Sequence, residues 1–376
     1  MRKILYHSIM RRKKIAVLRA NALGDFVFVL PALQALRETF PEAEIVYLGR
    51  EMHRILLEDR PGPVDRVEVI PSYPGVGKPE DYFQDIEEIA EAELFFARMQ
   101  AERFDIALQL HGGGQYSNPF VLRLGAELTI GLKSSAAPPL DVSVPYVTRF
   151  NEILRYLEVV SMLGAQTVHV APEIVVTERD LEAASRAVTD PDGRPFAVLH
   201  PGASDPKRRW PPENFAQVAD FLIGEGWQVY INGIAEEAGM AADIVSAMYH
   251  REWVEDLSGR LPLPALIGLL SQASLVISND SGPLHLAHAL QAPAIGIYWI
   301  GNLVTSMPAT SRFHRPVISW TTSCPLCGKE GAMLESEDSN CRHNTSFMRS
   351  ISVGEVKGAI GKLLNTGLYI PEPVPG

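Results

Sequence analysis

The chain has 376 residues, 46% of them hydrophobic and 21% charged, as in an ordinary globular protein, and this length favours two domains. Its net charge of −11 argues against general nucleic-acid binding, and no apolar run approaches the roughly 20 residues of a membrane-spanning helix. The basic N-terminus lacks the apolar core of a signal peptide, and three cysteines in one short segment do not make a secreted disulfide framework. We therefore expect a cytoplasmic protein without a nucleic-acid partner.

A cluster of positive charge precedes the first predicted strand. It contains Arg2, Lys3, Arg11, Arg12, Lys13 and Lys14. Two interpretations stay open: a solvated tail, or peripheral contact with anionic lipid head groups at the inner membrane.

The first half of the chain alternates short apolar strands with longer helices. The predicted strands are residues 15–18, 45–48, 66–70 and 105–110, and the predicted helices are residues 26–40, 80–103 and 151–164. In the acidic helix of residues 80–103 we expect Ile86, Ile89, Leu94 and Phe95 to face inward. This alternation predicts an α/β fold with a parallel sheet and helices on both faces.

Two polar loops follow strands in this half. Residues 19–25 form the turn after the first strand, and His111 with three glycines and Gln115 follows the strand of residues 105–110. The second loop suits a carbohydrate or another polyol, and its glycines equally suit a tight turn.

The second half repeats the alternation, with the domain boundary expected near residue 185. This gives an N-terminal domain of residues 1–185 and a C-terminal domain of residues 186–376, whose terminal helix could pack back on the first domain. Residues 200–211, 231–236 and 278–283 are three strand-to-helix junctions rich in glycine, polar and charged residues. Ligands bind at the carboxyl ends of strands in open parallel sheets. The glycine turn before Pro283 fits either a phosphate site at a helix N-terminus or a plain capped helix.

A different kind of segment follows residue 298. It contains a C-x-x-C pair, Cys324 and Cys327, and then Cys341 and His343. These four side chains could complete a tetrahedral structural site for zinc or iron, and the alternative is a set of reduced thiols in a loop.

Five stretches in order carry a family resemblance. They are KIAVLR, LGD and LPAL from residue 14, RYL and LG from 155, PGA, KRRWP and F from 201, GIAE from 233, and NDSGPLHLA from 279. The chain resembles the glycosyltransferase family that contains the ADP-heptose:lipopolysaccharide heptosyltransferases. The resemblance implies the GT-B architecture, in which two Rossmann-like domains with parallel sheets face each other across a cleft. It also implies inverting transfer without a catalytic cofactor, from an ADP-sugar, with heptose expected, to a lipopolysaccharide-core-type glycolipid or saccharide acceptor.

The resemblance also assigns residues. Asp25 matches the family's catalytic aspartate, which takes the proton of the acceptor hydroxyl, although an aspartate there also suits a helix cap. Arg208 matches the basic phosphate-binding position, and Glu236 matches the ribose-binding glutamate. The other residues expected to bind the donor are Lys207, Asp280, Ser281, Gly282 and His285. Those expected to contact the acceptor are Arg19, Asn21, Gly113 and Gln115.

Some of these assignments have alternatives. We expect Asp280 either to orient its loop or to hold hydroxyls of the donor sugar, because a carboxylate beside a diphosphate is repelled. His285 fits a buried structural role as well as a ligand role. The family's fourth finger cysteine is replaced here by Phe347 and Met348, which leaves only a metal site completed by His343. Two other functions stay open: a non-catalytic nucleotide-sugar-binding protein, and a GT-B sugar-nucleotide epimerase or hydrolase.

Overall fold

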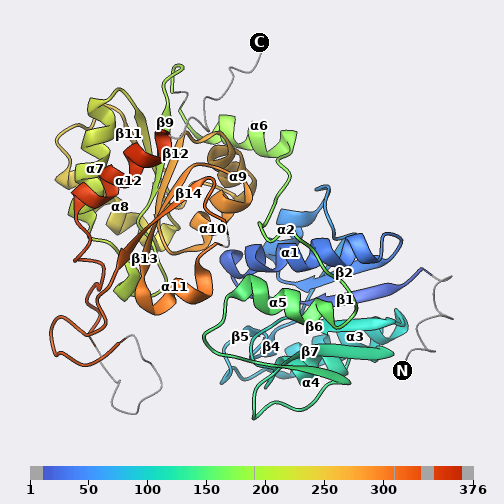
Figure 1. The fold of residues 1–376 in the computed structure, drawn as a ribbon. Coiled ribbons are helices and arrows are strands. Elements are labelled where there is room, and N and C mark those ends of the chain that lie inside the picture. Colours follow the sequence, from blue (N-terminus) through green and yellow to red (C-terminus); the bar gives the residue numbers. More distant parts are fainter. Residues whose placement is uncertain (1–11, 190, 309, 332–342, 366–376) are drawn as a thin grey trace. The chain divides into compact units, whose positions relative to one another are not determined.

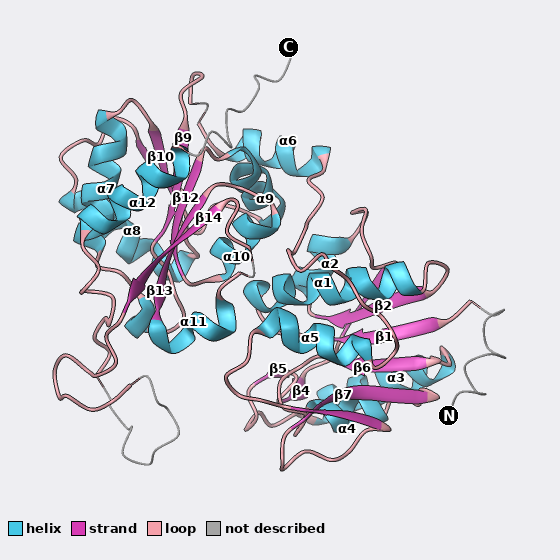
Figure 2. Ribbon diagram, in the orientation of Figure 1, coloured by secondary structure: helices cyan, strands magenta, loops and turns pink. Residues whose placement is uncertain are grey.

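The computed structural model describes residues 12–189, 191–308, 310–331 and 343–365. The chain divides into two compact units, residues 1–170 and 171–376. Each unit has one six-stranded parallel sheet with helices on both of its faces (Figures 1 and 2), which confirms the predicted α/β class. Within the described part of the chain, no helix is both long and apolar enough to cross a lipid bilayer.

The sheet of the first unit has the strand order β3-β2-β1-β6-β7-β8. Its strands are β1 (Lys14–Leu18), β2 (Glu44–Gly49), β3 (Arg66–Val69), β6 (Ile106–Gln109), β7 (Leu128–Lys133) and β8 (Val142–Pro145). A separate short pair consists of β4 (Tyr73–Pro74) and β5 (Gly77–Lys78). The order reverses between β1 and β6, so the loops that follow these two strands lie at the topological switch point.

Two helical layers cover this sheet. The helices are α1 (Leu23–Thr39), α2 (Glu51–Leu57), α3 (Ile86–Ala101), α4 (Ser117–Leu122) and α5 (Glu152–Ser161). Ala16 and Leu18 of β1 face one core, where they share a cluster with Phe96 of α3 and Phe120 of α4. Helices α1 and α5 contact each other.

The sheet of the second unit repeats the same topology, with the order β11-β10-β9-β12-β13-β14. Its strands are β9 (Phe196–His200), β10 (Gln228–Ile231), β11 (Val254–Asp256), β12 (Leu275–Asn279), β13 (Ala294–Trp299) and β14 (His314–Ser319). Here the switch point lies between β9 and β12, which are hydrogen-bonded neighbours.

The helices of the second unit follow these strands. They are α6 (Glu178–Ala187), η1 (Pro206–Arg208), α7 (Pro212–Gly224), η2 (Ala235–Glu237), α8 (Ala238–Ala247), α9 (Leu263–Gln272), α10 (Gly282–Ala289), α11 (Ile300–Ser306) and α12 (Val353–Leu364). The terminal helix α12 packs on α7, β13 and β14, with Val356 and Ile360 in the core of this unit. Helix α12 therefore belongs to the second unit. From the sequence, packing on the first domain had been considered possible.

The predicted domain boundary near residue 185 falls inside α6. This helix packs on α9 so closely that a Cβ added to Gly268 would lie 2.2 Å from the carbonyl oxygen of Asp180. Because Asp180 and Ala184 are buried in this contact, α6 folds with the second unit, and the division falls at residue 170.

Helix α3 begins later than predicted, and its inward face was predicted wrongly. Asp85 caps it by accepting a hydrogen bond from the amide of Glu88 (2.9 Å), so the helix starts at Ile86. Ile86 and Leu94 are exposed, whereas Ala92, Phe95, Phe96 and Met99 are buried. Of the four residues expected to face inward, only Phe95 is buried.

Candidate functional site

Asp25 is held at the switch point of the first unit. It is the third residue of α1, where its Oδ2 accepts a hydrogen bond from the amide of Ala22 (3.2 Å). Its Oδ1 accepts a second from Nη2 of Arg19 (2.7 Å). The side chain is nevertheless 34% exposed. Asp25 therefore makes a helix-capping contact, but the N-cap residue itself is Ala22. Its carboxylate is also accessible to solvent.

Arg19, predicted to contact the acceptor, is buried. Only 3% of its side chain is exposed, its Nη1 donates to the carbonyl oxygen of Leu110 (3.0 Å), and its guanidinium lies 4.9 Å from the ring centroid of Tyr156. Burial alone would lower the pKa of Arg19, but Tyr156 and the nearby carboxylates raise it above its ordinary value. In this structure Arg19 holds Asp25 in place.

His111 connects two loops at the same edge of the sheet. Its Nδ1 accepts from the amide of Ala20 (3.1 Å), and its Nε2 lies 3.2 Å from the carbonyl oxygen of Gly75, to which it donates. Burial lowers the pKa of His111 to about 3, so the ring is neutral near pH 7. His111 was predicted to follow a strand, but nothing in the sequence indicated this bridging role.

The other predicted acceptor residues lie in the same two loops. Asn21 is half-buried and Gln115 is exposed. The carbonyl oxygen of Gly113 accepts from the amide of Ser134 (2.7 Å). The adjacent Gly114 has a φ of 91°, and a Cβ there would lie 2.6 Å from the carbonyl oxygen of Leu132. This glycine is thus required by a tight turn, and the role of Asn21, Gly113 and Gln115 toward an acceptor stays a prediction.

In the second unit, Asn279 joins the loops of the two strands at the switch point. Its Oδ1 accepts from the amide of Trp210 (3.1 Å), and its Nδ2 donates to the carbonyl oxygen of Pro201 (2.7 Å). Both contacts bridge from the end of β12 to the segment that follows β9. The basic segment of residues 207–209 is thereby fixed beside the loop of residues 280–282.

Asp280 is a buried centre of polar contacts, with 1% of its side chain exposed. Its Oδ1 accepts from Nε2 of His285 (3.1 Å), and its Oδ2 accepts from Oγ of Ser306 (2.9 Å) and Nδ2 of Asn302 (3.3 Å). Arg208 donates to its carbonyl oxygen from Nη1 (3.2 Å). Burial would raise the pKa of Asp280, but His285 and Arg208 hold it below its usual value.

These contacts favour one of the roles predicted for Asp280. A buried carboxylate with so many donors orients its loop. His285 is likewise buried and donates to Asp280. A donor-binding role for either side chain stays a prediction. Sequence reasoning missed Asn302 and Ser306. They lie on α11, 22 and 26 residues after Asp280.

The basic segment after β9 forms a short 3-10 helix, η1. Besides its contact with Asp280, Arg208 donates from Nη2 to Oγ of Ser204 (2.7 Å), and its side chain is mostly buried. Nε of Arg209 donates to the carbonyl oxygen of Ala203 (2.9 Å). Lys207 is half-buried in η1. Of these three cations, Arg208 reaches the loop before α10, through its contacts with Asp280.

The start of α10 has the features of an anion site. Ser281 is its N-cap residue and Gly282 its first residue, yet the Ser281 side chain does not cap the helix. Its Oγ instead lies 3.1 Å from Oγ of Ser278. Helix N-terminal amides and the positive end of the dipole favour a phosphate at this position.

Glu236 is exposed in η2, after β10, whereas its neighbour Glu237 is tied into the loop. Oε2 of Glu237 accepts from the amide of Ile234 (3.0 Å). A Cβ on Gly202 would lie 2.0 Å from Oε1 of Glu237, so this glycine is what admits the carboxylate. Glu237 was not predicted, and Glu236 is left as the carboxylate that a ligand can reach.

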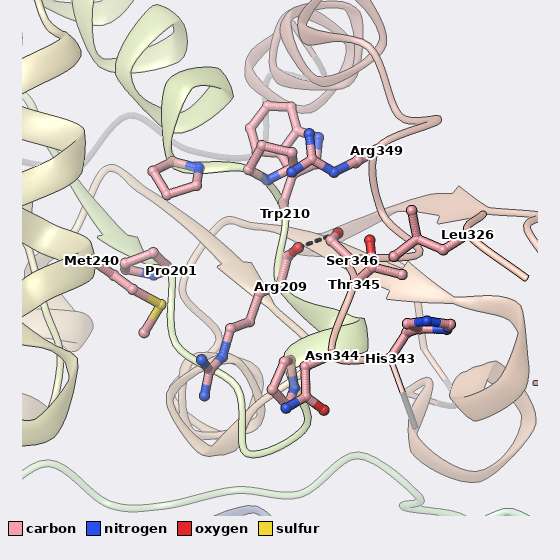
Figure 3. A pocket seen from close by; sticks show the side chains of 13 residues that line it. Pro201, Arg209, Trp210, Met240, Leu326, His343, Asn344, Thr345, Ser346 and Arg349 are labelled. Atoms are coloured by element: carbon pink, nitrogen blue, oxygen red, sulfur yellow. Dashed lines mark hydrogen bonds between the residues drawn. The ribbon is translucent and has the colours of Figure 1, made fainter. Parts of the chain in front are cut away.

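The basic segment also borders a pocket of about 460 Å³ (Figure 3). Trp210, Met240 and several prolines line it together with Arg209, Arg349 and the segment of residues 343–346. This last segment is attached to the basic one, because Oγ of Ser346 donates to the carbonyl oxygen of Arg209, drawn as a dashed line (2.5 Å). The amide of Phe347 donates to the carbonyl oxygen of Lys207 (2.9 Å).

Three of the four predicted metal ligands lie together. The ligand atoms of Cys324, Cys327 and His343 all fall within 4.8 Å of one another, and Cys341 lies outside the described residues. The C-x-x-C turn is closed by hydrogen bonds from the amide of Gly328 to Cys324 (2.9 Å) and from the amide of Cys324 to Lys329 (2.7 Å). Sγ of Cys324 lies 3.7 Å from Nδ1 of His343. A tetrahedron with Zn–S of about 2.3 Å and Zn–N of about 2.0 Å has an S···N edge of roughly 3.5 Å, so these residues fit such an ion.

Solved structures share this fold. The glycosyltransferase family 9 protein of Veillonella parvula is 22% identical with a TM-score of 0.75, over 94% of this chain and 97% of that one. Escherichia coli ADP-heptose lps heptosyltransferase II is 20% identical with a TM-score of 0.72, over 94% and 98%. The iron-containing dodecameric glycosyltransferase TibC from enterotoxigenic E. coli is 16% identical with a TM-score of 0.56, over 94% and 77%. These likenesses identify the fold as GT-B, as the sequence had implied.

Sequence comparison gives the family. Lipopolysaccharide heptosyltransferase 2 of Salmonella typhimurium is 30% identical over 130 residues, which are 34% of this chain. The matched region spans 37% of the length of that curated relative. The model of glycosyltransferase family 9 (heptosyltransferase) matches residues 94–324, more than half of the chain. The chain therefore belongs to glycosyltransferase family 9, the heptosyltransferase family.

Proposed function

We propose that this protein is an inverting glycosyltransferase that moves heptose from ADP-heptose onto a hydroxyl of a lipopolysaccharide-core-type acceptor. Its family membership and the names of its relatives support heptosyl transfer. The observation that carries the chemistry is Asp25, a fixed but solvent-accessible carboxylate at the switch point of one Rossmann-like unit. A general base must be both positioned and reachable by the proton it removes.

In the proposed reaction, Asp25 takes the proton from the acceptor hydroxyl as its oxygen attacks the anomeric carbon. The new carbon–oxygen bond forms on the face opposite the leaving group, so the configuration inverts. The bond between the anomeric carbon and the diphosphate breaks, and ADP leaves with the bonding electrons.

The second unit supplies what the leaving diphosphate needs. Arg208 and the N-terminus of α10 offer positive charge, with Lys207 nearby, and Glu236 is available to accept hydrogen bonds from a ribose diol. Each donor to a developing oxyanion contributes about 2–4 kcal/mol in comparable enzymes. This arrangement requires no catalytic metal or cofactor in the proposed mechanism.

The test separates base catalysis from donor binding. Asp25→Asn should lower the rate of transfer by about 10²–10⁴-fold, because general-base catalysis is lost while the side chain keeps its shape. Calorimetric titration should give the same ADP affinity as the wild type, since the donor residues lie in the second unit. Asp81→Asn, which changes an exposed aspartate of the same unit, is the matched control. Full transfer activity in Asp25→Asn would remove Asp25 from the mechanism.

The same experiment distinguishes the other functions considered. A non-catalytic nucleotide-sugar-binding protein would bind ADP-heptose and turn over nothing. An epimerase or hydrolase would consume ADP-heptose without an acceptor. Tighter binding of UDP or GDP than of ADP would be compatible with the GT-B fold but would contradict ADP-heptose as the donor.

We propose further that the Cys/His cluster is a structural site for zinc or iron. Cys324, Cys327 and His343 would hold the ion, with Cys341 as a fourth ligand, and one similar structure is described as iron-containing. The ion would fix the segment of residues 343–347, in which Ser346 and Phe347 are hydrogen-bonded to the basic segment of residues 207–209.

Elemental analysis tests this site directly. The purified protein should carry about one equivalent of zinc or iron, and Cys324→Ser should lose the ion and lower the thermal midpoint of unfolding. His250→Gln, an exposed histidine elsewhere in the second unit, should keep the wild-type metal content. Well below one equivalent after refolding with both ions would rule the site out.

We also propose that the acceptor is a glycolipid and that the N-terminal basic cluster holds the enzyme near an anionic membrane surface. Arg12, Lys13 and Lys14 are described, and the rest of the cluster lies outside the described residues. Sedimentation with anionic vesicles that falls with added salt would support this contact.

A further inference from the structure

Two carboxylates from different helices share one buried guanidinium in the first unit. Nη2 of Arg19 lies 2.7 Å from Oδ1 of Asp25 and 3.6 Å from Oε2 of Glu152. The same arginine is fixed on its other side, because Nη1 donates to the carbonyl oxygen of Leu110. Asp25 belongs to α1 and Glu152 to α5, which pack against each other.

Glu152 is itself held in place. Its Oε2 accepts a hydrogen bond from the hydroxyl of Tyr156, and its Oε1 accepts one from Nη1 of Arg155. Nη2 of Arg155 in turn donates to the carbonyl oxygen of Val147 (2.5 Å). Only 16% of the Glu152 side chain is exposed, in contrast to Asp25. Glu152 thus reaches the arginine without being open to a ligand.

The other titratable groups around Arg19 are uncharged near neutral pH. Burial lowers the pKa of His111 to about 3 and that of His53, on α2, to about 4. Burial raises the pKa of Tyr47, on β2, and that of Tyr156 above the usual tyrosine value. The charges that remain are those of Arg19, Arg155, Asp25 and Glu152.

We infer that Glu152 is a positioning residue that fixes the orientation of Asp25 through Arg19. This inference rests on the proposed role of Asp25 as the general base. Nη2 of Arg19 lies 2.7 Å from Oδ1 of Asp25, and the same atom faces Glu152 from α5. Because Glu152 holds this guanidinium from the other helix, it sets the direction from which Arg19 donates to Asp25. A general base has to be held within hydrogen-bond reach of the acceptor hydroxyl.

The experiment compares kcat and KM of the full chain and its variants. Glu152→Gln keeps the shape and removes the charge that faces Arg19, so Arg19 holds Asp25 less firmly. The kcat of transfer should fall about tenfold, because a misplaced base takes the proton less readily. The KM for ADP-heptose and the ADP dissociation constant should not change.

Two further variants keep the result interpretable. Glu158→Gln removes an exposed carboxylate from the same helix and should keep the wild-type kcat and KM. Tyr156→Phe removes only the hydroxyl that holds Glu152 and should give a smaller fall in kcat at unchanged KM, even if Glu152→Gln does not fold.

The outcomes separate this inference from the proposed function. If the wild type transfers heptose and Glu152→Gln loses ADP affinity and thermal stability together with kcat, Glu152 is merely structural and the inference is wrong. An unchanged kcat would overturn it as well. If Asp25→Asn retains full activity, the proposed base fails and this inference falls with it.

Discussion

At the scale of single residues, Asp280 allows a test whose sign is informative. If the carboxylate faced the donor, removing its charge would relieve repulsion and tighten ADP binding. In the structure Asp280 is buried and holds Arg208 and His285, so we predict the opposite. Asp280→Asn should weaken ADP binding about tenfold, which corresponds to about 1.4 kcal/mol. Calorimetry measures this change, with the exposed Asp243→Asn as the control. Tighter ADP binding by Asp280→Asn would contradict this prediction and indicate that the carboxylate faces the donor.

The sequence located these residues better than it explained them. The loops that hold Arg208 and Asp280 were singled out because they follow short apolar strands, and ligands bind at such ends. The roles of Asp25 and Arg208 came from the family resemblance. Their contacts could not be predicted, because they depend on side chains far along the chain. Glu152 lies on α5, yet it acts on the turn after β1. Only the packed structure brings a helix and a turn so distant in sequence together.

At the scale of elements, the strands predicted in the first half correspond to β1, β2, β3 and β6, whereas β7 and β8 were not predicted. Buried parallel strands are short apolar runs, and their length and the turn residues beside them distinguish them from helices. Helix α3 has apolar residues on more than one side, and the exposed Ile86 competes with the buried Phe96 for the inward face. Periodicity alone cannot choose between two such faces, because the choice depends on what the sheet offers opposite them.

The predicted domain boundary differs from the division in the structure for a related reason. Residues 167–195 have a weak hydrophobic pattern, because the buried residues of α6 are Asp180 and Ala184 and neither is a large apolar residue. Ala184 lies where a Cβ on Gly268 would come within 2.9 Å. Close helix packing through glycine and alanine contributes little to a hydrophobic pattern, so the boundary was predicted near residue 185, just before a Pro/Gly-rich stretch.

At the scale of the whole molecule, the two units can be followed separately during unfolding. All five tryptophans lie in the second unit, at positions 210, 227, 253, 299 and 320. Tryptophan fluorescence in urea therefore reports on the second unit, whereas circular dichroism reports on both. This matters because unfolding of two units need not be a single transition.

The second unit should lose stability in mild acid because it buries uncharged histidines. Nε2 of His288 lies 2.8 Å from Nδ1 of His314. Burial lowers the pKa of His314 to about 3 and that of His288 well below the usual 6.5. A lowered pKa means that the unfolded chain binds the proton first. The stability is thus fully present above pH 6.5 and is lost as the pH falls toward about 3. Each such histidine should remove about 2 kcal/mol from the free energy of unfolding by pH 5.

Urea titrations followed by tryptophan fluorescence at pH 7.5, 6.5, 5.5 and 5.0 would measure this loss. His314→Asn removes one of the titrating rings, so its stability should fall less steeply with pH, by up to about 1.4 kcal/mol per pH unit. His250→Asn removes an exposed histidine of the same unit and should keep the wild-type slope. Parallel slopes for the wild type and His314→Asn would mean that the His288–His314 pair accepts a proton without unfolding. The acid sensitivity of the unit would then have to come from other groups, among them the buried His200 and Asp280, both of which have a lowered pKa.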